Sequence, residues 1–220
     1  RRAAGAAAPG PGGAPAEAFD CFAVLDFEAT CDEPQQPVPM EIIEFPLVLV
    51  DARSLAVVGE FRTYVQPVRH PRLTSFCTQL TGIQQADVDA APPWRDALAQ
   101  AQAWLDGKME ECGYQNCVFV TCGEWDLQTM IVTQSAVSGL HVPACFKQWL
   151  NVKRLYQAAT GAPARGLPAM LAGLGLALDG RHHSGLDDSR NIAKILVRLL
   201  QRGVDVPRSL LSGGGDGPAA

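Results

Sequence analysis

Two acidic residues, Asp26 and Glu28, lie in an apolar, β-prone segment at residues 22–30. Side chains two positions apart on a strand point to the same face, so the two carboxylates should lie together while Phe27 points to the other face. Adjacent carboxylates repel, and burying such a pair is costly unless a cation compensates. The pair indicates a divalent-metal site, and the alternative is an edge strand with both acids in water.

A third acid, Asp126, follows the apolar segment 117–122, which reads as a buried strand, and lies in the first turn of a helix expected over residues 125–137. A period of 3.6 puts four residues on the inward stripe of this helix: Asp126, Met130, Thr133 and Val137. Asp126 is therefore a third candidate ligand, placed at a strand end and pointing toward the sheet. The alternative is an acid that only stabilises the helix dipole, a contribution of about 0.3 to 1 kcal/mol.

The helix expected from about Leu186 to Gly203 distinguishes between the neighbouring acids Asp187 and Asp188. The apolar residues 4, 7, 8 and 11 positions after Asp188 are Ile192, Ile195, Leu196 and Leu199, so Asp188 lies on the buried stripe. Asp187 shares its stripe with the polar residues Asn191, Lys194 and Arg198. Asp188 therefore needs a partner that metal ligation would supply, whereas Asp187 reads as an N-terminal helix acid.

Two histidines, His182 and His183, precede this helix on a loop that contains Gly185. From a loop, their side chains can reach a site that the helix cannot. The alternative is a simple surface histidine, the usual case for a histidine in a loop.

The rest of the chain supplies the elements that position these residues. Strands are expected over 22–30, 42–50, 57–65 and 117–122, and helices over 73–80, 84–89, 94–111, 125–137, 153–160, 167–175 and 186–203. Beyond Pro143 the pattern favours mostly helix. Strands followed by alternating strand and helix predict a mixed α/β fold with helices on both faces of the sheet.

We expect one domain over residues 19–206, preceded by a disordered leader at 1–18 rich in Ala, Gly and Pro, and followed by a flexible tail at 207–220. Seven scattered cysteines without CxxC spacing predict a reducing compartment, cytoplasm or nucleus, with an organelle left open. No apolar run approaches the length of a membrane span. The net charge is −5, but residues 141–220 carry 10 Lys and Arg against 5 Asp and Glu, which is compatible with a phosphate-facing side.

The order of these motifs resembles the DEDDh exonucleases. The motifs are Asp-x-Glu-Ala-Thr at 26–30, Trp-Asp after a strand at 125–126, and His-Ser-Gly-Leu-Asp-Asp-Ser-Arg-Asn-Ile-Ala at 183–193. The segments at 22–31, 41–46, 76–83 and 146–151 are similar to the Eri-type branch, and the similarity extends over residues 20–206. The stretch 160–167 is closer to the short, single-domain members. No SAP-type RNA-binding domain, which some members carry upstream, is recognisable, and this argues against histone-mRNA stem-loop binding.

The resemblance implies an RNase H-like fold and a 3′ to 5′ exonuclease that acts on single-stranded or overhanging RNA 3′ ends. It identifies Asp26, Glu28, Asp126 and Asp188 as the metal-binding acids. His183, five residues before Asp188, is implied as the catalytic histidine, a general base for the attacking water. The cofactor expected is two Mg²⁺ ions, for which Mn²⁺ can substitute. The nucleotide-binding residues implied are Glu28, Ala29, Leu80, Thr81, Trp125 and His183.

Two alternative functions and two residue roles remain open from the sequence. The chain could be a catalytically silent RNA-binding or protein-interaction module, although all five polar residues are present, or it could be an exonuclease directed at DNA. Trp125 suits base stacking but equally suits core packing. The basic helix face formed by Arg190, Lys194, Arg198 and Arg202 could guide an RNA backbone, but favourable interaction with the helix dipole explains it more simply. The sequence does not identify a protein partner.

Overall fold

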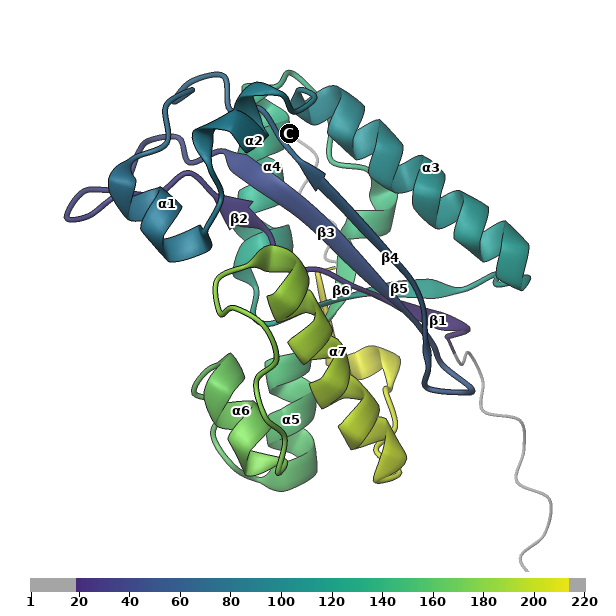
Figure 1. Cartoon of the computed structure of the whole chain (residues 1–220). Helices are drawn as coiled ribbons and strands as arrows, with labels where there is room; N and C mark the ends of the chain where they lie inside the picture. The colour runs from purple at the N-terminus through teal and green to yellow at the C-terminus, as the bar shows by residue number, and fades with distance from the viewer. Residues whose placement is uncertain (1–18, 214–220) are drawn as a thin grey trace, which may run out of the picture.

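A mixed seven-stranded sheet forms the centre of the computed structural model, which describes residues 19–213. The strands are β1 (Cys21–Val24), β2 (Glu28–Ala29), β3 (Ile42–Asp51), β4 (Val57–Tyr64), β5 (Cys117–Thr121), β6 (Gln148–Asn151) and β7 (Leu211–Gly213). Their order is β2-β3-β1-β5-β6-β7, and β4 pairs with β3. Figure 1 shows the long β3 and β4 running side by side across the molecule.

Strand direction decides where the polar residues gather. β1, β5 and β6 are parallel neighbours, with Val24 opposite Val120 and Thr121 opposite Asn151. β3 is antiparallel to β1, β2 and β4, and β7 is antiparallel to β6. The carboxyl ends of β1, β5 and β6 therefore meet at one edge of the sheet, which is where ligands bind in sheets of this kind.

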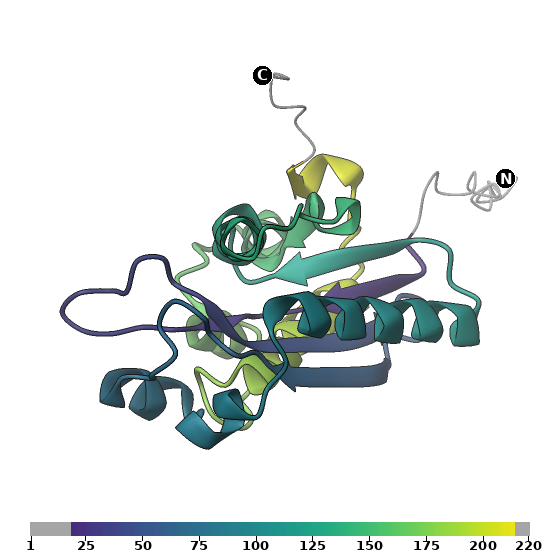
Figure 2. The ribbon, with the colours of Figure 1, turned by 90° about the horizontal axis from the view of Figure 1, so that it is seen from above.

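Helices cover both faces of the sheet (Figures 1 and 2). The α-helices are α1 (Ser75–Thr81), α2 (Gln85–Asp89), α3 (Trp94–Cys112), α4 (Ile131–Val137), α5 (Val152–Thr160), α6 (Leu167–Gly173) and α7 (Gly185–Gln201). The short helices are the π-helix η1 (Trp125–Met130) and the 3-10 turns η2 (Ala144–Phe146) and η3 (Arg208–Leu210).

The apolar residues divide between the faces of the sheet. One core lies between the sheet and α3 and includes Phe45, Trp94 and Phe119. A second lies between the sheet and α5, α6 and α7 and includes Ile192 and Leu196. The apolar stripe predicted for α7 is thus buried, and the predicted mixed sheet with helices on both faces is confirmed.

Two strands were not expected from the sequence. β6 and β7 lie beyond Pro143, where the pattern favoured helix, and both are too short to show a clear period. β7 also differs from the expected flexible tail from residue 207, because η3 and β7 extend the described structure to residue 213. The expected leader at 1–18 and the last seven residues lie outside the described residues.

Two local irregularities change the expected geometry near the polar residues. Strand β1 ends at Val24, so Asp26 lies in the link between β1 and β2 and not on one continuous strand with Glu28. The helix after β5 begins with a π turn, which adds a residue to the first turn and shifts its buried face. The predicted stripe is therefore wrong after Met130: the buried residues that follow are Ile131, Gln134 and Ser135, and not Thr133 and Val137.

No helix within residues 19–213 is long and apolar enough to cross a membrane.

Candidate active site

Asp26, Glu28 and Asp188 converge at the sheet edge where β1, β5 and β6 end. One carboxylate oxygen from each of the three lies within 4.8 Å of the others. Glu28 and Asp188 are 8% and 2% exposed, and Asp26 is partly exposed. Residues more than 150 positions apart in sequence thus form one acidic cluster, as the shared face of Asp26 and Glu28 and the phase of α7 predicted.

The close approach of α7 to the β1–β2 link brings Asp188 to the other two acids. Gly185, at the start of α7, has no side chain, and a Cβ there would lie 2.6 Å from the backbone oxygen of Asp26. Only glycine permits this contact without a shift of one of the two segments. Asp187, by contrast, points away from the cluster and pairs with Arg190 at 3.0 Å.

Asp126 lies next to this cluster but is not one of the three mutually close acids. Its Oδ1 accepts a hydrogen bond of 2.9 Å from the backbone N–H of Phe27, in the β1–β2 link. The carboxylate is buried, and its negative charge adds to the raised pKa of Asp26. The structure therefore brings all four predicted acids to one region, with Asp126 fixed by the link that carries Asp26.

Burial and mutual repulsion raise the pKa values of these acids. Burial raises the pKa of Glu28 to about 9, and the negative charges of Glu44 and Asp188 add to the shift. Burial raises the pKa of Asp26 well above its ordinary value, and that of Asp126 to about 6. Without a cation the site thus disfavours its own ionised state, which is the electrostatic signature of a cation-binding or catalytic site.

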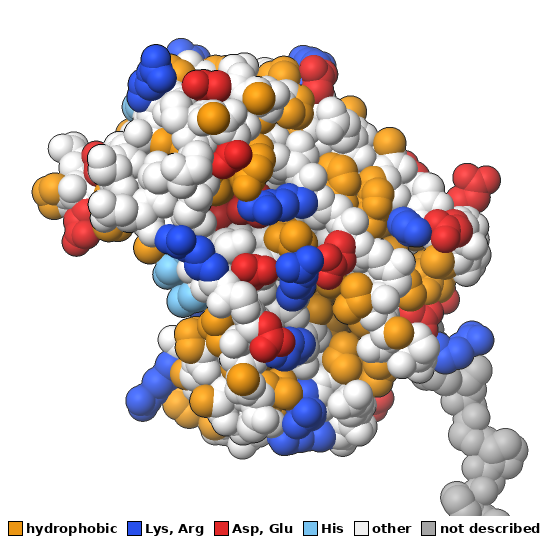
Figure 3. All heavy atoms as spheres, in the orientation of Figure 1, with side chains coloured by type: hydrophobic (Ala, Val, Ile, Leu, Met, Phe, Trp, Pro, Cys, Tyr) orange, Lys and Arg blue, Asp and Glu red, His pale blue; other side chains and the backbone are white. Residues whose placement is uncertain are grey.

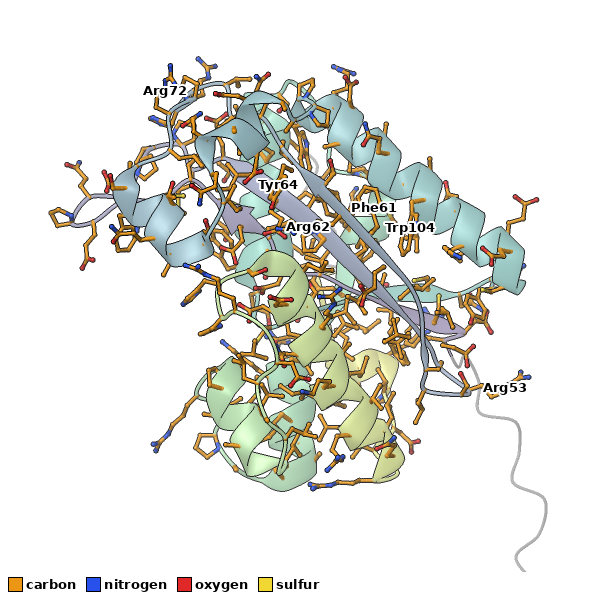
Figure 4. The ribbon with its side chains drawn as sticks, viewed as in Figure 1. Arg53, Phe61, Arg62, Tyr64, Arg72 and Trp104 are labelled. Atoms are coloured by element: carbon orange, nitrogen blue, oxygen red, sulfur yellow. The ribbon has the colours of Figure 1, made fainter. Side chains whose placement is uncertain are left out.

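Glu44, on β3, is a buried acid that the sequence did not single out as part of the site. Its carboxylate accepts hydrogen bonds from the backbone N–H groups of Gly185 and Leu186, at 3.1 and 3.3 Å. Arg62, on β4, pairs with it at 2.7 Å. Figure 4 shows Arg62 beside Tyr64 on β4, next to the first turn of α7.

Glu44 therefore anchors the amino end of the helix that carries Asp188, where a negative charge also interacts favourably with the helix dipole. The available sequence signal was an acid within an otherwise continuous apolar run, Ile42 to Val50, since a charge in a buried strand requires partners.

His182 and His183 lie beside Asp188 with their rings stacked, at a centroid separation of 4.0 Å. His182 Nδ1 lies 3.0 Å from a carboxylate oxygen of Asp188. His183 contacts the same carboxylate through its backbone N–H at 2.8 Å, while its side chain is exposed. His183 also has a positive φ of 66°, which is uncommon for a residue with a side chain.

The imidazole predicted as general base is thus at the site but faces solvent, and His182 makes the side-chain contact that the sequence did not predict. Burial lowers the pKa of His183, and the neighbouring His182 adds to this shift. A lowered pKa keeps the ring neutral and able to accept a proton. Figure 3 shows histidine side chains at the molecular surface next to basic side chains.

The expected nucleotide-binding residues occupy different environments. Trp125 is 40% exposed, so core packing does not account for it. Ala29 and Thr81 are buried, and the Thr81 hydroxyl donates to the carbonyl of Cys77, while Leu80 is partly buried. Arg181 joins α1 to the histidine loop by donating to the carbonyl oxygens of Gln79 and Leu80.

Three of the four cations of the predicted basic face, all but Arg202, are engaged in internal contacts. Arg190 pairs with Glu60 and Asp187, Lys194 pairs with Asp179, and Arg198 donates to the carbonyl of Leu174. Figure 3 shows acidic and basic side chains interspersed on this side of the molecule. These contacts favour the structural interpretation of that face over an RNA path.

The donor set fits a hard divalent cation. The converging groups are carboxylates, and Mg²⁺ prefers oxygen ligands supplied by a few carboxylates together with water and substrate phosphate. Burial raises the pKa values of Glu28 and Asp126, so a bound cation would stabilise their ionised forms.

Comparison with known proteins agrees with the geometry. The model of the exonuclease family matches residues 23–196. ERI1 exoribonuclease 3 of Homo sapiens is 46% identical over 192 residues, covering 86% of this chain and 56% of that protein. The 3'-5' exonuclease Snipper of Drosophila melanogaster is 35% identical over 193 residues, covering 81% of this chain and 69% of Snipper.

Among solved structures, the nuclease domain of 3'hExo, described as a DEDDh family member bound to rAMP, superposes with a TM-score of 0.80 at 38% identity. The match covers 86% of this chain and 96% of that domain. The chain spans little more than half the length of ERI1 exoribonuclease 3, and the shared part is the nuclease region described above. With the acids of its DEDDh motifs gathered at one sheet edge, the chain belongs to the exonuclease family, as an Eri-type member of the DEDDh branch.

Proposed function

We propose that this chain is a metal-dependent 3′ to 5′ exoribonuclease that releases nucleoside 5′-monophosphates, in the 3′-end processing of small RNA, rRNA or mRNA. The observation that carries the proposal is the convergence of Asp26, Glu28 and Asp188 within 4.8 Å, with Asp126 at the next strand end. The family is dependent on a divalent metal. The name of the human relative, an exoribonuclease, and the rAMP bound to the similar nuclease domain support RNA as the substrate.

Asp26, Glu28, Asp126 and Asp188 would hold two Mg²⁺ ions, for which Mn²⁺ can substitute. When bound, the ions would supply an activated water and neutralise the charge on the departing oxygen. The protein contributes rigid placement of the acids: Phe27 N–H orients Asp126, and the backbone of His183 and the ring of His182 orient Asp188.

His183 is proposed to accept the proton of the attacking water. Its exposed ring can turn toward a bound RNA end, and its lowered pKa keeps it neutral at physiological pH. His182 is already engaged with Asp188, so its proposed part is to hold that carboxylate in place.

Trp125 is proposed to stack on the terminal base, a contact worth about 1 to 3 kcal/mol. Its exposure beside Asp126 supports this, because a stacking platform must reach solvent. Ala29, Leu80 and Thr81 would line the other side of the nucleotide, with Glu28 and His183 nearest the sugar. Thr81 would contribute shape only, since its hydroxyl is already bonded to Cys77 and Ile83.

Digestion of a 3′-overhang RNA and a matched DNA with Mg²⁺, with EDTA as the control, tests the proposal. We expect stepwise release of 5′-monophosphates from RNA, lost with EDTA and in Asp26→Asn and Asp188→Asn. Equal or faster digestion of the DNA would shift the assignment to a DNA-directed exonuclease. RNA binding without cleavage at any divalent metal would favour a silent binding module.

A further inference from the structure

Lys153 lies just after the carboxyl end of β6. This strand is the third of the parallel strands that end at the site, and none of the four acids follows it. Asp26 follows β1, Asp126 follows β5, and Lys153 follows β6 as the second residue of α5. Since these three strands are parallel neighbours, the three residues come to the same edge of the sheet. The topology thus adds one cation to a cluster of acids.

The ammonium of Lys153 lies close to the turn that leads into Asp126. A Cβ built on Gly123 would be 3.7 Å from Lys153 Nζ, and Gly123 is three residues before Asp126. Lys153 is itself partly buried, so its side chain is confined near this turn.

Within residues 19–213, the Lys153 ammonium makes no hydrogen bond, and it forms no ion pair with a carboxylate within 4 Å. The other cations near the site are held: Arg62 by Glu44, and Arg181 by the carbonyls of Gln79 and Leu80. The adjacent Arg154 is paired with Glu124 at 2.7 Å. Among residues 19–213, this partly buried ammonium is therefore available to bind an anion.

The backbone at the amino end of α5 does not by itself provide an anion site beside Lys153. Its backbone N–H at Lys153 is already bonded to the side chain of Asn151, at 3.0 Å. Any anion at this position must therefore be bound by the lysine side chain, which offers three rotatable donors and a compact charge.

We propose that Lys153 binds a non-bridging phosphate oxygen of the RNA at the cleavage site, an inference that rests on the proposed function. The phosphodiester adds negative charge at a site already crowded with carboxylates, and Lys153 is the protein group placed to offset it. The lysine is assigned a substrate-binding part, with no proton transfer.

The test compares Lys153→Ala and Lys153→Arg with Lys147→Ala. Lys147 is exposed and directly precedes β6, so it is matched in charge and strand but lies at the opposite edge of the sheet. Binding of a fluorescent 3′-overhang RNA is measured by anisotropy in EDTA, where no cleavage occurs, over a series of salt concentrations. kcat/KM in Mg²⁺ and thermal unfolding are measured on the same proteins.

Each phosphate contact contributes about 0.7 to the slope of log K against log salt for a single strand. We expect Lys153→Ala to reduce the magnitude of the slope by about 0.7 and to weaken binding about tenfold, with an unchanged Tm. Lys153→Arg keeps the slope, and Lys147→Ala matches the wild type.

An unchanged slope and affinity in Lys153→Ala, with wild-type cleavage of RNA, would overturn this inference and leave the proposed function intact. A change only in the metal concentration needed for activity would also overturn it, because Lys153 would then act on the acids. A wild type whose RNA binding depends on Lys153 but which cleaves no RNA would refute the nuclease proposal while supporting the phosphate contact.

Discussion

Asp187 and Asp188 are adjacent acids with opposite environments. Asp188 is 2% exposed and lies among the clustered carboxylates, whereas Asp187 pairs with Arg190 toward solvent. The phase of the apolar residues in α7 distinguished them from sequence alone, because a helix has one buried stripe.

These environments predict unequal effects of the same substitution. Removal of a group that only supports a metal ligand typically lowers metal affinity or activity 10- to 100-fold. The loss of a direct ligand should lower activity by more than this. We expect Asp188→Asn to lower kcat/KM on RNA by more than about 10²-fold, and Asp187→Asn to leave it within a few-fold. Equal losses in the two variants would show that Asp188 is not a ligand.

The two histidines should also separate in kinetics. As general base, His183 should contribute about 10² to 10⁴ to kcat, so His183→Ala should lose that factor with little change in KM. His182→Ala, which removes only the support of Asp188, should lose less. The lowered pKa of His183 places the acid limb of the kcat profile below the ordinary imidazole value of about 6.5, because the ring stays neutral to lower pH.

At the scale of elements, strand β4 holds helix α7 through the buried Glu44. Arg62 pairs with Glu44, and Glu44 accepts the N–H groups of Gly185 and Leu186. Removal of the partner of a buried charge is costly, although Arg62 is partly exposed and solvent weakens the effect.

We therefore expect Arg62→Ala to cost about 1 to 2 kcal/mol, which corresponds to a drop in Tm of roughly 2 to 8 °C. The double variant Arg62→Ala with Glu44→Gln should recover part of this loss, since no unpaired charge remains. Urea denaturation of the single and double variants measures both effects, and additive losses would contradict the coupling.

Elements with long, regular patterns were predictable from the sequence, and short or irregular ones were not. The period of α7 and the apolar runs of β3 and β5 gave both the fold class and Asp188. β6 follows a Pro-containing loop and has only four residues, too few for a hydrophobic period to identify it as a strand. The π turn of η1, whose Asp126 is bonded to the β1–β2 link, has no signature in the local sequence that we could read.

The same distinction holds for the site. Asp26 and Glu28 were paired on a strand period, and their carboxylates do converge, although Asp26 lies beyond the end of β1. Glu44 and the His182 contact with Asp188 were missed, because each depends on a partner more than five residues away in sequence.

For the whole molecule, the buried acids oppose folding until a cation binds. The pKa of Glu28 is about 9 in the fold and about 4.5 in the unfolded chain. Between those values the unfolded chain binds fewer protons than the folded one, so the free energy of unfolding falls as pH rises through this window. Mg²⁺ should reverse this loss, because it binds the ionised carboxylates of the folded state alone.

We therefore expect Glu28→Gln to raise the Tm of the metal-free protein at pH 8, and Mg²⁺ to raise the Tm of the wild type more than that of the variant. Calorimetry with and without EDTA measures both. A lower Tm for metal-free Glu28→Gln would contradict the proposed electrostatic conflict. The buried Glu41 is not a suitable control position, because its carboxylate accepts three backbone hydrogen bonds that a Glu41→Gln substitution would disturb.

Strand β7 has a practical consequence for anyone who shortens this protein. It covers the outer edge of β6, and its Ser212 hydroxyl donates to Glu124, two residues before Asp126. A version ending at residue 206 would expose the backbone N–H and C=O groups along one edge of β6. Another chain could pair with this edge, so we expect such a version to aggregate. Expression vectors for crystallography or assays should therefore extend through Gly213.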